Sequence, residues 1–109
     1  MAAIIQDIET EIETLKKIIK INPITNVKSL LAQAYLRKND GIVNEFIKKL
    51  IDEVLFEKPK DPGANFILAK YLNQNGNKNK SRNLLLKILK NLDDKGPWHQ
   101  IYKDELNIK

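Results

Sequence analysis

The chain contains no cysteine and only one histidine, His99, among its 109 residues. The absence of cysteine excludes disulfides, thiol chemistry and cysteine-based zinc sites, and one histidine is too few for a histidine-ligated metal or a Ser/His/Asp triad. No apolar run approaches the roughly 18 residues of a membrane-spanning helix. P-loop, Gly-x-Gly-x-x-Gly and nucleophile-elbow motifs are also missing. We therefore expect no enzyme activity, no metal and no cofactor.

The remaining composition is that of an ordinary globular chain, with 42% hydrophobic and 30% charged residues, and its length predicts one domain spanning residues 1–109. The start of the chain lacks the basic region of a signal peptide and becomes acidic at Asp7. This favours a cytoplasmic protein. The alternative is an exported soluble domain trimmed from a membrane-anchored protein.

The net charge of +5 is unevenly placed along the chain. Residues 1–61 hold ten acidic and ten basic side chains, whereas residues 62–109 hold four and nine. The basic excess centres on Lys78, Lys80, Arg82, Lys87 and Lys90. A nucleic-acid-binding protein would use such a segment for phosphates, but interleaved aromatics and glycine-rich loops are absent. A solvated face or an acidic protein partner is the favoured interpretation.

Apolar periodicity predicts an all-α fold with about six helices. In residues 3–21 one apolar residue recurs at alternating steps of three and four, which is one helical face. Further helices are expected over about 25–38, 42–57, 62–74, 79–92 and 97–107. Asp61 and Pro62 make a good N-cap and first-turn pair. No strand pattern occurs, and the short connections predict antiparallel neighbours.

Two segments of the chain repeat one another. LLAQAYLRKND (30–40) recurs in weaker form as ILAKYLNQNGN (67–77), aligned on Ala32 and Ala69. Each has a large apolar residue before the alanine, an apolar residue three positions later, and a turn followed by a second apolar helix. We expect six of these residues to be buried: Leu31, Ala32, Tyr35, Leu68, Ala69 and Leu72. A repeat of this size indicates stacked helical hairpins.

These residues resemble the tetratricopeptide repeat, a helix-turn-helix unit whose first helix carries a large-small pair where its partner crosses. Pro59 stands at the position of the terminal proline of the repeat. The resemblance implies repeat one over 25–61, repeat two over 62–94, a capping helix over 97–107 and an extra N-terminal helix over 3–21. The second helices depart from the pattern. Their crossing positions hold Ile47 and Val54 in one unit and Ser81 and Ile88 in the other, and only Ser81 is small.

The resemblance implies a protein-interaction module that holds a peptide or helix in a concave groove. Positions carried over from the family place the following residues in that groove: Asn26, Ser29, Gln33, Leu36, Arg37, Phe66, Lys70, Asn73 and Gln74. The Lys and Asn pattern that clamps chaperone carboxylates is absent. A competing interpretation leaves Phe66 buried against the preceding hairpin and the polar residues as solvated surface.

The stretch DDKGPWHQIYKDEL (93–106) is similar to the tail of the tetratricopeptide subunit of c-type cytochrome maturation. That similarity implies holding an apocytochrome segment for haem ligation. The alternative interpretation of Trp98 is a core anchor that seals a cap, with His99 a solvated neighbour.

The apolar face of residues 3–21 also predicts a homodimer, because its spacing is that of a heptad seam. The seam residues are Ile5, Ile8, Ile12, Leu15 and Ile19. The competing interpretation is that this face packs on the second helix of the same chain.

Overall fold

The computed structural model describes the backbone of residues 2–107 and the side chains of residues 7–107. Within these residues there are six helices and no strand, which confirms the predicted all-α fold. The helices are α1 (Ala2–Ile21), α2 (Thr25–Lys38), α3 (Glu45–Glu57), α4 (Pro62–Gln74), α5 (Lys78–Leu89) and α6 (Pro97–Leu106).

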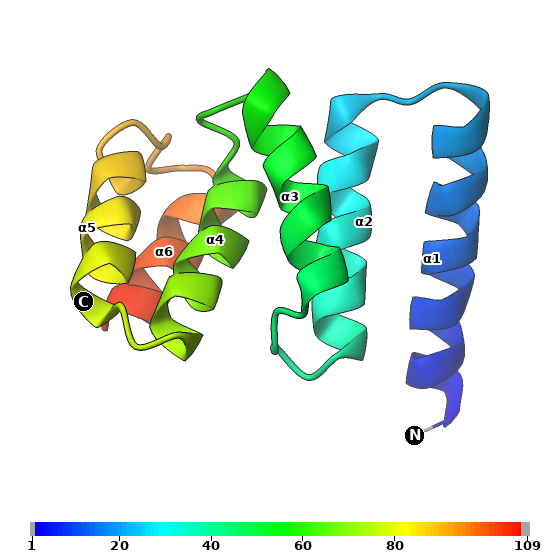
Figure 1. Ribbon diagram of the computed structural model, residues 1–109, viewed down its shortest axis with the longest axis horizontal. Coiled ribbons are helices and arrows are strands. Elements are labelled where there is room, and N and C mark those ends of the chain that lie inside the picture. The colour runs from blue at the N-terminus through cyan, green and yellow to red at the C-terminus, as the bar shows by residue number, and fades with distance from the viewer. Residues whose placement is uncertain (1, 108–109) are drawn as a thin grey trace.

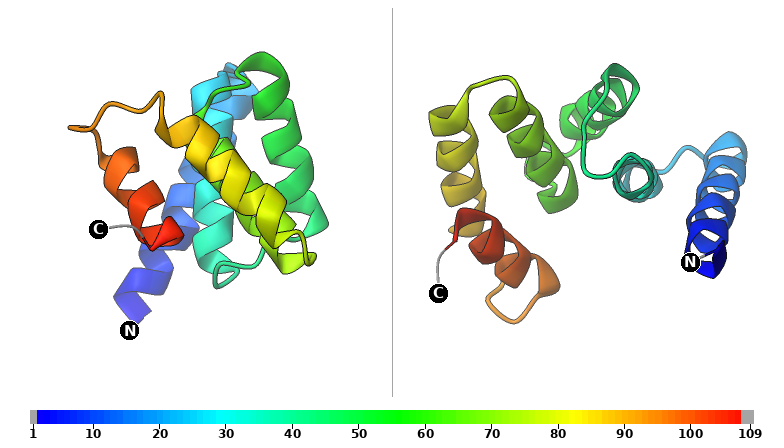
Figure 2. Two further views of the ribbon diagram at one scale, coloured as in Figure 1. Left: turned by 90° about the vertical axis from the view of Figure 1, so that its left-hand side faces the viewer. Right: turned by 90° about the horizontal axis from the view of Figure 1, so that it is seen from below.

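Successive helices run antiparallel and stack as hairpins (Figure 1). α2 contacts α3 and also α4, and α4 contacts α5 and also α6. α2, α4 and α6 therefore form one layer, and α3 and α5 form the other. Among the residues that the structure describes, α1 contacts α2 and no other helix. Figure 2 shows that the path is curved, with α1 and α6 at the two ends of the concave side.

The helix boundaries follow from local chemistry. The Asp61 side chain accepts a hydrogen bond from the backbone N–H of Ala64 at 2.8 Å, and Pro62 occupies the first turn, which confirms the predicted cap of α4. α3 begins at Glu45 rather than at residue 42. Asp40 and Gly41 have positive φ and keep the chain in a turn until Asn44 caps the helix. α5 ends at Leu89, three residues before the predicted end.

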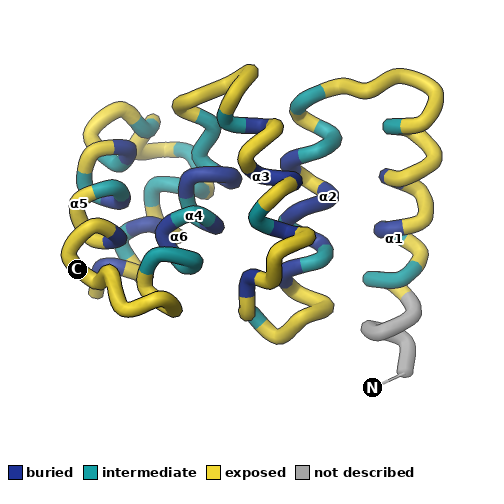
Figure 3. The backbone as a smooth tube through the Cα atoms, in the orientation of Figure 1, coloured by how far each residue is buried: buried dark blue, intermediate teal, exposed yellow. Residues whose placement is uncertain are grey.

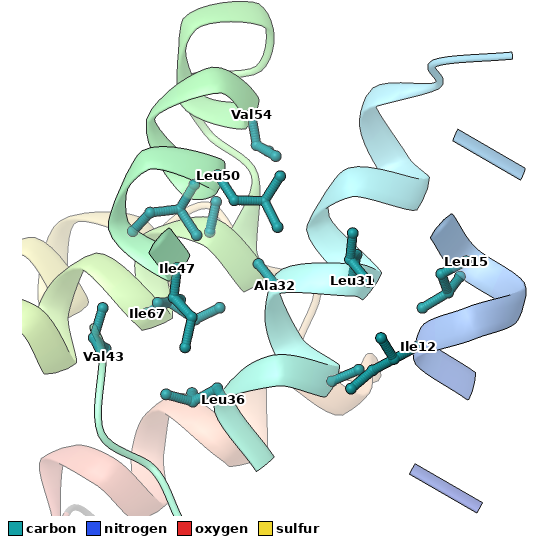
Figure 4. Close-up of a cluster of buried hydrophobic side chains, with 13 residues drawn as sticks. Ile12, Leu15, Leu31, Ala32, Leu36, Val43, Ile47, Leu50, Val54 and Ile67 are labelled. Atoms are coloured by element: carbon teal, nitrogen blue, oxygen red, sulfur yellow. The ribbon is translucent and has the colours of Figure 1, made fainter. Parts of the chain in front are cut away.

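The larger of two apolar clusters is formed by α1, α2 and α3 together with the start of α4. Figure 4 shows that side chains of α1 lie on one side of α2 and side chains of α3 lie on the other. Its buried members are Ile12, Leu15, Leu31, Ala32, Ala34, Leu36, Val43, Ile47, Leu50, Ile51, Val54, Ala64 and Ile67. Figure 3 shows the buried stretches on the inward sides of the helices.

The second cluster joins α4, α5 and α6 through Ala69, Leu85, Ile88, Tyr102 and Leu106. Of the six residues predicted to be buried, Leu31, Ala32 and Ala69 are buried. Tyr35, Leu68 and Leu72 are only partly buried, which corrects that prediction. For Tyr35 the reason is visible, because its ring packs edge-on against the exposed ring of Phe46 at 5.0 Å between centroids.

The apolar face of α1 is covered by α2. Ile12 and Leu15 are buried, and Ile8 and Ile19 are partly buried against the same cluster. Ile5 lies outside the side chains that the structure describes. The described part of the predicted dimer seam is therefore used within the chain, so a homodimer through it would require α1 to leave α2.

Candidate concave groove

The concave side contains a hollow of about 330 Å³ that four helices line. We call this hollow the four-helix groove. Its lining residues are Glu11 from α1; Leu30, Gln33, Leu36 and Arg37 from α2; Phe66 and Ile67 from α4; and Trp98 and Ile101 from α6. Since α2 and α4 lie side by side between α1 and α6, residues far apart in sequence share one surface (Figure 2).

Apolar side chains dominate this lining. Leu30 is 48% exposed and Ile101 is 37% exposed, although both are large aliphatic residues on packed helices. Phe66 lies 5.8 Å from Trp98 and 5.7 Å from Tyr102, measured between ring centroids. This aromatic group fixes α6 against α4 and makes one end of the groove a rigid apolar surface.

The charged side chains at the groove are paired. Arg37 Nη2 donates to Glu11 Oε1 at 2.6 Å, which joins α2 to α1. Beside Phe66, Lys70 Nζ lies 3.3 Å from Glu105 Oε1 and 5.0 Å from the centroid of the Phe66 ring. Both cations therefore already have a carboxylate partner, and the groove presents balanced charge around an apolar floor.

Four of the predicted groove residues line this hollow together: Gln33, Leu36, Arg37 and Phe66. Lys70 stands next to Phe66 without lining the hollow. Phe66 is partly buried and packs against Trp98 and Tyr102 of α6. These residues were predicted from positions carried over from the tetratricopeptide resemblance, and those on α2 share one face because side chains on one face recur every three to four positions.

The other predicted residues are engaged elsewhere. Ser29 is buried and donates to Asp61 Oδ2 at 2.8 Å, which ties α2 to the start of α4. Asn26 accepts from Lys58 Nζ at 2.6 Å. The Gln74 side chain holds the α2–α3 turn, accepting from Val43 N and donating to the Gly41 carbonyl, each at 3.1 Å. Asn73 lines a separate hollow with Glu105.

Sequence reasoning missed five lining residues: Glu11, Leu30, Ile67, Trp98 and Ile101. α1 and α6 were interpreted as caps, so their inward residues were not assigned to the groove. Trp98 does pack on the second cluster as the core-anchor interpretation expected, but it also faces the hollow. The sequence did offer one signal for the missed lining, because Leu30 is an additional apolar residue directly before the Leu31-Ala32 pair.

Burial raises the pKa of the Tyr102 phenol, and the nearby Asp61 carboxylate adds to this effect. The Tyr102 hydroxyl donates to the Pro62 carbonyl at 2.6 Å, so the neutral phenol connects α6 to the first turn of α4. A hydrogen bond to Glu9 raises the pKa of Lys38 on the surface. Both pKa shifts therefore arise from contacts between packed helices.

Within the described residues, no group of three or more His, Cys, Asp or Glu side chains is placed to hold a metal ion. None of the described helices combines the length and apolar character that crossing a membrane requires.

Comparison with family models, with curated proteins and with solved structures found no match to this chain. The tetratricopeptide resemblance and the apocytochrome-holding role therefore stay predictions.

Proposed function

We propose that this chain is a non-enzymatic protein-interaction module that holds a peptide or short helix of a partner protein in the four-helix groove. The observation that carries the proposal is the exposure of Leu30 and Ile101 in a hollow of about 330 Å³ on the concave side. Concave, largely apolar sites with a few polar groups are the usual form of a ligand site.

The order of helix contacts supports the tetratricopeptide part of this proposal. The first helix of each hairpin contacts the first helix of the next, α2 with α4 and α4 with α6. A stack of this kind presents its first helices along one concave surface. We propose that α2, α4 and α6 serve as that surface here, with α1 as an added wall.

The lining indicates the chemistry of the partner. A helix can enter such a groove by inserting apolar residues at positions i, i+3 and i+4 against the host helices. Because Arg37 and Lys70 are both paired with carboxylates, the partner does not need a strong charge of one sign. Gln33 lines the groove without being buried and supplies a hydrogen-bonding group for the partner backbone.

Selection from a displayed peptide library, followed by binding measurements, tests this proposal. Peptides selected on the wild-type chain should bind the Leu30→Lys and Ile101→Lys variants at least about tenfold more weakly. Each change introduces a charge that the bound peptide would bury against apolar surface. Gln33→Ala and Lys70→Glu should weaken binding less. Ile42→Lys, at an exposed isoleucine outside the groove, is the matched control and should bind as the wild type does.

Peptides that bind all of these variants equally well would place the interaction surface outside the groove. Failure to select any peptide, while the chain remains folded by circular dichroism, would contradict the proposal directly.

A second candidate function, binding to nucleic acid through α5, is favoured by one observation. In the part of the chain that the structure describes, no ion pair involves Lys78, Lys80, Arg82, Lys87 or Lys90. A slope of about −0.9 per phosphate contacted, in a plot of log affinity against log salt, would support it. Binding to a peptide that persists at raised salt would support the groove.

A further inference from the structure

The two most exposed of the large apolar side chains that the structure describes lie at one end of the molecule. Ile21 is 86% exposed and Phe56 is 88% exposed. Ile21 is the last residue of α1, and Phe56 is the last residue but one of α3. Ile24, which is also exposed, directly precedes α2. We call Ile21, Ile24 and Phe56 the apolar tip.

The three residues of the apolar tip belong to neighbouring chain segments. The ends of α1 and α3 and the beginning of α2 all lie at the upper edge of the molecule in Figure 1. Lys58, just after α3, donates to Asn26 in the first turn of α2 at 2.6 Å, which joins two of these segments. Lys28 and Phe56 line the same shallow hollow.

The apolar tip is accompanied by lysines. Residues 14–39 contain no aspartate or glutamate. Among the described residues, Lys17, Lys20 and Lys28 form no ion pair, and Lys60, four positions after Phe56 in the chain, forms none either.

The acidic groups on this side of α3 are Asp52, Glu53 and Glu57. Asp52 is paired with Lys48, and Asp61 caps α4. Among the described residues, Lys17, Lys20 and Lys28 therefore have no ion-pair partner, although Glu53 and Glu57 line the same shallow hollow as Lys28.

We propose that this end of the molecule docks on an anionic lipid surface, with the apolar tip entering the boundary between headgroups and acyl chains. Isolated apolar side chains at helix ends find a continuous apolar medium in a bilayer, whereas a folded partner would need a separate pocket for each. The lysines on the same chain segments are attracted to anionic headgroups. The inference is independent of the groove, which lies on the concave side and is lined by other residues of α1 and α2 together with α4 and α6.

Co-sedimentation with vesicles tests the proposal. The wild-type chain should bind vesicles of equal parts phosphatidylserine and phosphatidylcholine, and bind phosphatidylcholine alone much less. The double variant Ile21→Ser with Phe56→Ser should lose at least about tenfold in partitioning, because two protruding apolar groups are removed. Both positions are exposed, so thermal unfolding should be almost unchanged.

Matched variants separate this end from the rest of the molecule. Ile42→Ser with Phe46→Ser removes two exposed apolar side chains at the opposite end of α3 and should bind vesicles as the wild type does. The double variant Lys17→Glu with Lys20→Glu should reduce vesicle binding by at least about fivefold for each lysine replaced. Lys80→Glu with Lys87→Glu on α5 should leave most of the binding intact.

Several outcomes would overturn the proposal. Loss of vesicle binding in the α5 variant, with the apolar-tip variant unchanged, would mean simple electrostatic adsorption through α5. No vesicle binding by the wild type would also overturn it. A protein complex that is lost only in the apolar-tip variant, without vesicle binding, would assign this end to a protein partner instead.

Discussion

The hairpins α2–α3 and α4–α5 have the same antiparallel arrangement but different residues where their helices cross. In the first hairpin the crossing residues of α3 are Ile47 and Val54, both buried and both large. In the second, Ile88 of α5 is likewise buried, but the other crossing residue is the small Ser81, whose hydroxyl donates to the Ala69 carbonyl at 2.7 Å. Both crossing positions of the first hairpin are filled by aliphatic volume, whereas the second replaces one of them with a hydrogen bond to the facing backbone.

The helices that cover the two hairpins differ in the same way. α1 covers the first hairpin with Ile12 and Leu15, and the surface ion pair between Lys38 and Glu9, at 2.8 Å, adds to the contact. α6 covers the second with the buried Tyr102, whose hydroxyl is bonded to α4. The difference shows that a helical stack tolerates either solution, provided that each buried polar group finds a partner. The predictions below test this contrast.

The largest effect is expected for Ile47→Ala. Ile47 is 1% exposed in the centre of the larger cluster, and its truncation should cost about 2–5 kcal/mol because a cavity remains after the side chain is removed. Denaturant unfolding measures this loss, and Ile42→Ala at an exposed position is the control, expected to be nearly neutral. If Ile47→Ala lost no more unfolding free energy than the control, the first crossing would not be filled by volume.

Ala69→Leu should give the next largest effect. Ala69 is 1% exposed, and Ser81 approaches its backbone closely, so the larger side chain must displace packed neighbours. Overpacking of this kind costs about 1–3 kcal/mol. A neutral result in denaturant melts would contradict both the close crossing and the alignment of the two repeats.

Local signals in the sequence were sufficient for most of the fold. Apolar periodicity placed α1, and the pair Asp61-Pro62 placed the start of α4. The predicted start of α3 was wrong because Ile42 and Val43, which follow the turn, continue the apolar pattern of the helix. The positive φ of Gly41 forms the turn and Asn44 caps the start of α3, and apolar periodicity alone does not show either feature.

The candidate site was harder to predict because it depends on tertiary neighbours. Gln33 and Phe66 were predicted from positions carried over from the tetratricopeptide resemblance, but Glu11 and Ile101 enter the groove only because α1 and α6 stand on either side of it. Ser29 and Gln74 are polar residues expected at a surface. Their partners, Asp61 and the turn at Gly41, are more than thirty positions away in the chain, so no local pattern shows these contacts.

Tyr102→Phe tests the helix that covers the second hairpin through its pH dependence. The folded-state pKa of Tyr102 is raised by burial and then by Asp61. Above the ordinary phenol pKa of about 10, the unfolded chain loses this proton while the folded chain keeps it, so stability falls as pH rises. The stability of the variant should therefore decline less steeply with rising pH than that of the wild type. At neutral pH the variant should lose about 0.5–1.5 kcal/mol of stability because the hydrogen bond is missing.

Thermal unfolding measured between neutral and alkaline pH checks this expectation. Tyr35→Phe, a partly buried tyrosine of the first hairpin, is the matched control and should keep the wild-type alkaline decline, because Tyr102 is still present. Parallel alkaline curves for the Tyr102 variant and the wild type would show that the phenol at this contact does not govern the decline.

The smallest effect is expected for Ser81→Ala, and it bears most directly on the contrast between the crossings. Removing the hydroxyl costs the bond to the Ala69 carbonyl, but alanine favours the helix more than serine does, so the net loss should be about 0.5 kcal/mol. Asn83→Ala, an exposed change on α5, corrects for the propensity gain. A Ser81 variant as stable as the Asn83 variant would mean that small size alone, and not the hydrogen bond, sets the second crossing. A deficit relative to Asn83→Ala would show that this hairpin depends on a polar contact where the first depends on volume.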